Sequence, residues 1–151
     1  MQIKFGGVVD FDTSIEKARA FLRDTEKVAS CIPDSRGFAR KDDTHFTVNV
    51  EMGIGAVKGI LAMDCRLEEL DDNKYAYTIE GSGAGSNIKV VLVLELSSKG
   101  ASLAQLQWSS TSDIRGIMTG IGEPIIRRVS SEYIETIIAN ARQRLSETPV
   151  K

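Results

Sequence analysis

The sequence predicts an α+β fold that combines a seven-stranded antiparallel sheet with two short helices and one long C-terminal helix. Three observations support this fold class. Residues 35–115 alternate between apolar and polar side chains in strand-length runs separated by short turns, which is typical of an antiparallel meander. A helix start signal follows the first strand at Thr13. Beyond Pro124, apolar residues recur at every third or fourth position as far as Leu145, which is the spacing of a helix.

The N-terminal segment predicts one strand followed by two short helices. Apolar side chains alternate along the strand from Ile3 to Phe11, so they share one face of the sheet. Thr13 and Glu16 have the spacing of a capping box, from which we expect the first helix to start at Thr13. The second helix, TEKVASCI, begins at Asp24 or the next residue and ends before a proline, because the residue that precedes a proline disfavours helical backbone.

Six further strands complete the expected sheet. Each is a run of alternating apolar and polar residues, and polar or glycine-rich turns connect successive runs. The expected strands cover residues 35–41, 45–52, 60–70, 75–81, 87–96 and 101–114. The final helix is expected at about 123–146, with Glu123 and Pro124 in its first turn, and a short tail follows at 147–151.

This order of elements, β-α-α-β-β-β-β-β-β-α, resembles the helix-grip fold, also called the START-like or Bet v 1-like fold. The resemblance implies that the sheet is strongly curved and wraps around the long C-terminal helix. A single domain over residues 1–151 accommodates all of these elements, because typical domains hold about 100–150 residues.

Composition argues against several classes of function. A net charge of -2 is unsuited to a nucleic-acid-binding protein, which needs a concentrated basic surface. Neither a signal peptide nor an apolar run of about 20 residues is visible, so we expect a cytoplasmic location. One histidine and two cysteines, Cys31 and Cys65, do not form a metal-binding pattern. We predict that both cysteines are buried thiols, although the sequence leaves a disulfide between them open.

Three glycine-containing loops are expected to meet at one end of the sheet. In an up-and-down antiparallel sheet every second connection lies at the same end, so GIGAVKG (53–59), GSGAGS (81–86) and RGIMTGIGEP (115–124) share it. We call this end the glycine rim. It also carries apolar side chains such as Ile54 and Val57, which gain free energy only by covering something apolar. We predict that they border the mouth of an apolar cavity. The alternative is that the loops fold over and fill the core.

The inward face of the sheet is predicted to line that cavity. Its side chains are apolar, aromatic or hydroxyl-bearing, and no histidine, aspartate or glutamate falls on an inward position. His45 precedes an inward residue and therefore faces outward, where we expect it to be solvated. The residues predicted to contact a ligand, in the cavity and at its mouth, are Phe46, Ile54, Val57, Met63, Tyr75, Tyr77, Leu92, Trp108, Ser110, Met118, Ile121 and Tyr133.

This interior favours binding over catalysis, because an acid–base pair has no inward position. The leading hypothesis is a non-catalytic protein that holds a hydrophobic small molecule. Other functions remain open on the sequence. A helix-grip enzyme, such as a cyclase or hydratase, would have to use Tyr75, Tyr77 or Ser110. A general lipid carrier would use the same cavity, and a protein-interaction module would have a filled core.

Four segments resemble one family, the CoxG family of carbon monoxide dehydrogenase subunits. GIGAVKG (53–59) resembles its G-x-G-[PA]-V-K-G hairpin, which is the most specific match. FLRDTEKVASCIPD (21–34) is similar to its L-x-D-(x)n-C-I-P-G segment, with Asp34 where glycine is usual. GSGAG (81–85) and RGIMTGIGEPIIRRVSSEYI (115–134) are similar to its glycine-rich loop and to the entry of its last helix.

The resemblance implies an accessory role beside an aerobic molybdenum-containing CO dehydrogenase or a related molybdenum hydroxylase. It also implies that the ligand is a quinone, or another isoprenoid or lipid, with no covalently bound cofactor, no metal and no catalytic residue. A further implication is that the protein helps to place this enzyme at the membrane. Because this chain ends at SETPVK without a hydrophobic tail, we expect transient membrane contact through the glycine rim, at the inner face of the membrane.

Overall fold

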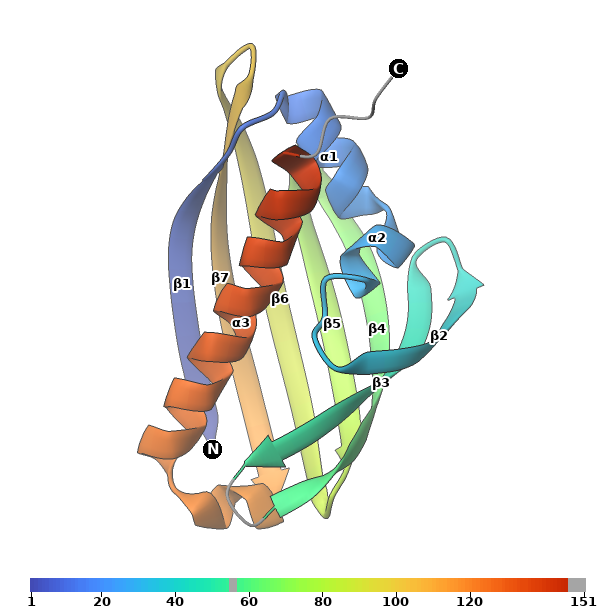
Figure 1. The fold of residues 1–151 in the computed structure, drawn as a ribbon, viewed down its shortest axis with the longest axis vertical. Coiled ribbons are helices and arrows are strands. Elements are labelled where there is room, and N and C mark those ends of the chain that lie inside the picture. The colour runs from blue at the N-terminus through green and yellow to red at the C-terminus, as the bar shows by residue number, and fades with distance from the viewer. Residues whose placement is uncertain (55–56, 147–151) are drawn as a thin grey trace.

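The computed structural model describes residues 1–54 and 57–146 and shows a curved antiparallel sheet with one long helix across its concave face (Figure 1). The seven strands have the order β1-β7-β6-β5-β4-β3-β2, so β1 pairs with the last strand and the others form a meander. This arrangement confirms the predicted fold class. Gly55 and Ala56 of the GIGAVKG loop and the tail at 147–151 lie outside the described residues.

The elements extend the predicted ranges mainly at the turns, where strand pairing continues to the last residues. In chain order they are β1 (Gln2–Phe11), α1 (Ile15–Arg23), α2 (Thr25–Ala29), β2 (Ser35–Asp42), β3 (His45–Ile54), β4 (Val57–Asp71), β5 (Lys74–Gly83), β6 (Ser86–Gly100), β7 (Leu103–Gly116), the 3-10 helix η1 (Ile117–Ile121) and α3 (Glu123–Ser146). The longest pair, β6 and β7, stays in register from Ser86 opposite Gly116 almost to its turn.

The two short helices begin at side-chain caps. Ser14 caps α1, and its hydroxyl accepts a hydrogen bond from the backbone N–H of Lys17 at 3.2 Å. The sequence placed this cap at Thr13, which was wrong by one residue, because Thr13 is buried and does not supply the capping oxygen. The second helix, α2, begins at Thr25, within the predicted start, and Asp24 caps it, because its carboxylate accepts two backbone N–H groups of the first turn.

The loop between α2 and β2 contains a left-handed residue where the family motif has glycine. Asp34 has a φ of 57°, a conformation that glycine adopts freely and that aspartate tolerates better than most residues. Its carbonyl oxygen accepts a hydrogen bond from the backbone N–H of Glu51 at 3.0 Å, which joins the loop to β3. The substitution therefore preserves the turn.

Two apolar clusters hold the helices on the concave face. The larger one packs α1, α2 and the C-terminal part of α3 against the sheet and contains Phe11, Phe46 and Tyr77 among its buried members. The smaller one lies at the glycine rim and consists of Ile3, Ile54, Ile114, Met118 and Ile126. Fully burying an aliphatic or aromatic side chain of this kind contributes about 1.5–3 kcal/mol, so both clusters stabilise the grip of the sheet on α3.

Both cysteines are buried and free, as the sequence predicted. Burial raises the pKa of the Cys65 thiol to about 12 and also raises the pKa of Cys31. Each thiol is therefore protonated and unreactive in the folded protein. None of the helices within the described ranges has both the length and the apolar content needed to cross a membrane.

Candidate functional site: an apolar hollow beneath the long helix

The loops of the glycine rim meet in the structure, as strand counting predicted (Figure 1). The backbone N–H of Ile117 in η1 donates to the carbonyl of Gly85 in the β5–β6 turn at 3.0 Å. On the other side of that turn, a Cβ on Gly59 would lie 2.9 Å from the Cβ of Ala84. This close approach explains why the last residue of the GIGAVKG motif is glycine. The β3–β4 hairpin, the β5–β6 turn and η1 therefore pack together at one end of the sheet.

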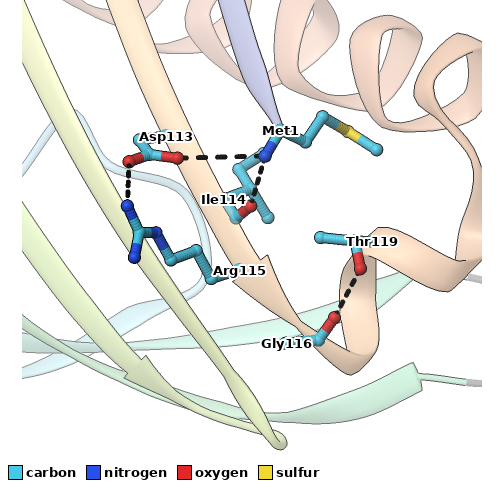
Figure 2. Close-up of polar contacts among 6 residues, drawn as sticks. All are labelled: Met1, Asp113, Ile114, Arg115, Gly116 and Thr119. Atoms are coloured by element: carbon cyan, nitrogen blue, oxygen red, sulfur yellow. Dashed lines mark hydrogen bonds and ion pairs between the residues drawn. The ribbon is translucent and has the colours of Figure 1, made fainter.

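Short polar contacts hold the end of β7 and the start of η1 in place (Figure 2). Thr119 Oγ1 donates to the carbonyl of Gly116 at 2.7 Å and closes the turn after β7. The amino group of Met1 donates to the carbonyl of Ile114 at 3.0 Å and lies 3.9 Å from a carboxylate oxygen of Asp113. These contacts stabilise the rim around the buried side chains of η1 and β7.

An apolar hollow of about 130 Å³ lies between the inward face of the sheet and the N-terminal half of α3. Inward residues of β3 to β7 form one wall, residues 126–137 of α3 form the other, and Met118 closes the rim end. Most of the lining side chains are aliphatic. Among the described residues of the wall, side-chain oxygen atoms come from Ser110, Ser112, Ser130 and Tyr133.

A second hollow of about 80 Å³ continues along α3 toward α1. Its wall includes Tyr77 and Trp108. It shares Leu92, Ile134 and Ile137 with the larger hollow, so the two are neighbours. Together they form an elongated apolar space along the inner face of the long helix.

The position of the entrance to the larger hollow is inferred from how the two ends of α3 are held. From Tyr133 onward, hydrogen bonds fix α3 to the loop that follows α2. Tyr133 donates to the carbonyl of Pro33 at 3.0 Å. Asn140 donates to the carbonyl of Cys31 at 2.9 Å, and Arg144 to that of Ser30 at 3.1 Å. The part of α3 that precedes Tyr133 contains the lining residue Ser130, which is only half-buried, as is the lining residue Met52 at the end of β3. We therefore infer that the entrance lies between the end of β3 and this part of α3.

The sequence left two alternatives for the apolar side chains of the rim, which were to border a cavity or to fill the core, and Ile54 and Met118 do both. Ile54 and Met118 are buried in the smaller apolar cluster, as expected of residues that fill the core. The same side chains also line the larger hollow. Ile117 remains 65% exposed on the outside of the rim.

The structure distributes the predicted site residues between the hollows and the core. The larger hollow is lined by Ile54, Met63, Leu92, Ser110, Met118 and Tyr133, and the smaller one by Tyr77, Leu92 and Trp108. Phe46 and Tyr75 are buried in the larger cluster and line neither hollow, while Val57 and Ile121 lie at the rim outside both linings. Contact of any of these residues with a ligand stays a prediction.

Sequence reasoning missed most of the wall that α3 supplies. Ile126, Val129, Ile134 and Ile137 line the larger hollow, together with inward residues of β6 such as Val90. The signal was present as the three- and four-residue spacing of apolar positions in the final helix. That spacing identifies a buried face but does not distinguish packed core from the wall of a hollow.

The tyrosine hydroxyls near the hollows are engaged with the backbone. Tyr75 donates to the carbonyl of Asp72 and Tyr77 to the carbonyl of Leu22, each at 2.7 Å. Burial raises the pKa of both phenols, and also that of Tyr133, so all three are neutral at physiological pH. Their hydroxyls stabilise the fold as hydrogen-bond donors.

His45 lies on the outer face, as predicted, but it is not simply solvated. Its Nε2 lies 2.5 Å from Oδ1 of Asp64, and its side chain is only 17% exposed. The hydrogen bond with His45 lowers the pKa of the Asp64 carboxyl. Pairing of β3 with β4 brings the two side chains together. No group of three or more histidine, cysteine, aspartate or glutamate side chains suited to a metal ion occurs in the described part of the chain.

The curved sheet and the long helix on its concave face define a START-like helix-grip fold. A conserved protein from Geobacillus kaustophilus is similar over 95% of both chains, with a TM-score of 0.86 and 16% identity. A START superfamily protein from Mycobacterium smegmatis covers 94% of this chain and 96% of its own, with a TM-score of 0.71 and 16% identity. The Zhui aromatase/cyclase from Streptomyces sp. R1128 covers 96% and 94%, with a TM-score of 0.69 and 10% identity. At these identities the similarity shows the fold.

The family model that describes CoxG, a subunit of carbon monoxide dehydrogenase, matches residues 7–146. This chain therefore belongs to the CoxG family, as its glycine motifs predicted. The comparison with curated proteins finds no significant match.

Proposed function

We propose that this protein is a non-catalytic, cytoplasmic carrier that holds a hydrophobic small molecule, in the first place a quinone, for a molybdenum-containing CO dehydrogenase or a related enzyme. The observation that carries the proposal is the apolar hollow beneath α3. A ligand that covers this wall removes apolar surface from water, which contributes about 25 cal/mol per Å². Membership of the CoxG family supports the choice of partner enzyme. The choice of a quinone rests on what the resemblance to that family implies.

The size of the hollow suits a single ring. An engineered apolar cavity of about 150 Å³ in another protein binds benzene, and the larger hollow here measures about 130 Å³. An isoprenoid tail would extend through the entrance. At about 24 cal/mol per Å³, an empty hollow of 130 Å³ costs at most about 3 kcal/mol, which a bound ring would offset.

The chemistry of the wall supports binding without catalysis. Among the described lining residues of the larger hollow, none is a histidine or carries a charge. Of the three residues that an enzyme could use, Tyr75 and Tyr77 donate their hydroxyl hydrogens to backbone carbonyls, and only Ser110 keeps an unengaged hydroxyl, with no acid or base beside it in the described wall. The presence of two adjoining hollows also argues against a protein-interaction module with a filled core.

The decisive experiment is a search for bound and bindable ligand. Native mass spectrometry and organic-solvent extraction of the purified protein should reveal a retained quinone or lipid. Titration with a short-chain quinone should show saturable binding to one site. A protein that carries no extractable ligand and does not bind the quinone at its solubility limit would refute the proposal.

We also propose transient contact with the membrane through the glycine rim. Ile117 of η1 is 65% exposed, and the neighbouring Arg115 side chain is 78% exposed. An exposed apolar side chain beside a cation suits the boundary between acyl chains and anionic headgroups. Flotation with vesicles that contain anionic lipid should recover the wild type and less of Ile117→Ser. Val8→Ser, at a residue 61% exposed in the middle of β1, is the matched control. Equal flotation of both variants and the wild type would refute contact at the rim.

A further inference from the structure

Ser110 places a hydroxyl without a partner in the wall of the larger hollow. Its side chain is 1% exposed, and its Oγ has no hydrogen-bond partner within residues 1–54 and 57–146. Strand pairing sets it between Phe5 of β1 and Leu92 of β6, whose side chains offer no polar atom. A buried hydroxyl in this position loses its hydrogen bonds to water without gaining one from the protein, which is unfavourable.

The other hydroxyls near the hollow differ from that of Ser110. Ser86, which is buried at the rim, accepts a hydrogen bond from the backbone N–H of Met118 at 2.9 Å. Tyr133 donates to a backbone carbonyl, and Ser130 is half-buried. Ser112 is buried in the same wall, but its Oγ, unlike that of Ser110, is not both fully enclosed and without a partner. Ser110 therefore stands out as an oxygen in this wall whose hydrogen bonding a ligand could complete.

Ser110 also marks the inner end of the larger hollow. Along β7, Ile114 and Ser112 line the same hollow but lie nearer to the glycine rim. Trp108, two residues farther from the rim, lines the smaller hollow instead. Leu92, which pairs with Ser110, lines both. The Ser110 hydroxyl therefore lies where the two hollows adjoin. Of the β7 residues that line the larger hollow, Ser110 is the farthest from the glycine rim.

We propose that Ser110 hydrogen-bonds a ring oxygen of the ligand, so that the ligand enters ring first and its tail points toward the entrance. The inference rests on the proposed function and adds to it the orientation of the ligand and the residue that recognises its polar atom. A serine hydroxyl donates to a carbonyl and accepts from a hydroxyl, so Ser110 can hold either form of an oxygen-bearing ring without changing its own charge. The aliphatic wall supplies affinity, and Ser110 supplies selectivity for an oxygenated ring over a hydrocarbon ring.

The test compares two probes of nearly the same shape. Duroquinone carries two ring carbonyls, and durene has the same four methyl groups on a ring without oxygen. Both are titrated into the wild type, Ser110→Ala and the control Ser109→Ala, whose side chain lies on the outer face of the same strand. Ser110→Ala should weaken duroquinone binding about 3- to 10-fold, which is the net value of one hydrogen bond, and should leave durene binding unchanged or tighter. Ser109→Ala should change neither.

Each other outcome has a definite meaning. If Ser110→Ala leaves duroquinone affinity unchanged, or weakens both probes equally, the role of Ser110 is refuted while the proposed function stands. If neither probe binds the wild type, the inference fails, and the proposed function fails with it when extraction also recovers no quinone or lipid. We expect Ser110→Ala to keep or raise the melting temperature, because it removes a hydroxyl without a partner. Should that variant unfold, Ser110→Cys retains a side chain of similar size with a weak donor and is expected to show the same loss of selectivity.

Discussion

Filling the larger hollow should stabilise the empty protein and weaken ligand binding. Val90 lies on β6, in the wall of the hollow opposite Ser112 in the strand register. Val90→Phe adds four carbon atoms at this position. The added ring occupies space that is otherwise empty, and it does so where a ligand ring would bind.

The expected gain follows from the volume. At about 24 cal/mol per Å³ the whole hollow of 130 Å³ costs at most about 3 kcal/mol, so a side chain that fills about a third of it recovers about 1 kcal/mol. In a protein of this size, about 1 kcal/mol raises the melting temperature by about 2–4 °C. Because the remaining space no longer admits a ring, duroquinone affinity should fall at least about 10-fold, which corresponds to a loss of about 1.4 kcal/mol.

Thermal unfolding followed by circular dichroism and titration with duroquinone measure the two effects. Val91→Phe is the matched control, because the next residue along the strand points to the outer face and adds the same atoms outside the hollow. The control should retain the affinity of the wild type. A Val90→Phe variant that melts at a lower temperature and still binds duroquinone like the wild type would show that the space under α3 is not open to a ligand.

Three further predictions concern other parts of the molecule. Gly116→Ala should lower the free energy of unfolding in urea by more than about 1 kcal/mol, because Gly116 has a φ of 100° and a Cβ there would clash with the backbone carbonyl oxygen of Gly85. Gly100→Ala, where a Cβ meets nothing within 4 Å, is its control, and equal effects would contradict the strain argument. The hydrogen bond with His45 lowers the pKa of the Asp64 carboxyl. The pair therefore stabilises the folded protein fully above the ordinary aspartate pKa of about 3.9, and this stabilisation is lost as the pH falls through the lowered pKa. His45→Phe should therefore reduce the loss of stability below about pH 4 in urea titrations, and an unchanged acid limb would count against the pair. The Cys65 thiol, with a pKa of about 12, should resist a thiol reagent at pH 8 in the native protein and react in denaturant, whereas rapid native reaction would show that it is accessible.

Local patterns were sufficient to predict the elements and the end of the sheet at which the glycine loops meet. The reason is physical: alternation fixes which face of a strand is inward, and antiparallel connectivity fixes which connections share an end. Ile54 and Met118 could therefore be assigned to the rim from the order of the strands alone. Both side chains lie in the smaller apolar cluster at the rim, which bears out that assignment.

The tertiary structure alone decided which inward residues line an open space. Phe46 and Leu92 are both inward-facing and apolar, yet Phe46 is packed in the core and Leu92 lines both hollows. That difference depends on how far α3 stands from each part of the curved sheet, which no local pattern encodes. Hydrogen bonding is equally non-local. Whether Ser110 lacks a partner and whether His45 has one depend on every strand and helix packed around them. The sequence by itself determined the fold and an uncharged interior. The packing of α3 against the sheet decided the volume of the hollow and the enclosure of the Ser110 hydroxyl without a hydrogen-bond partner.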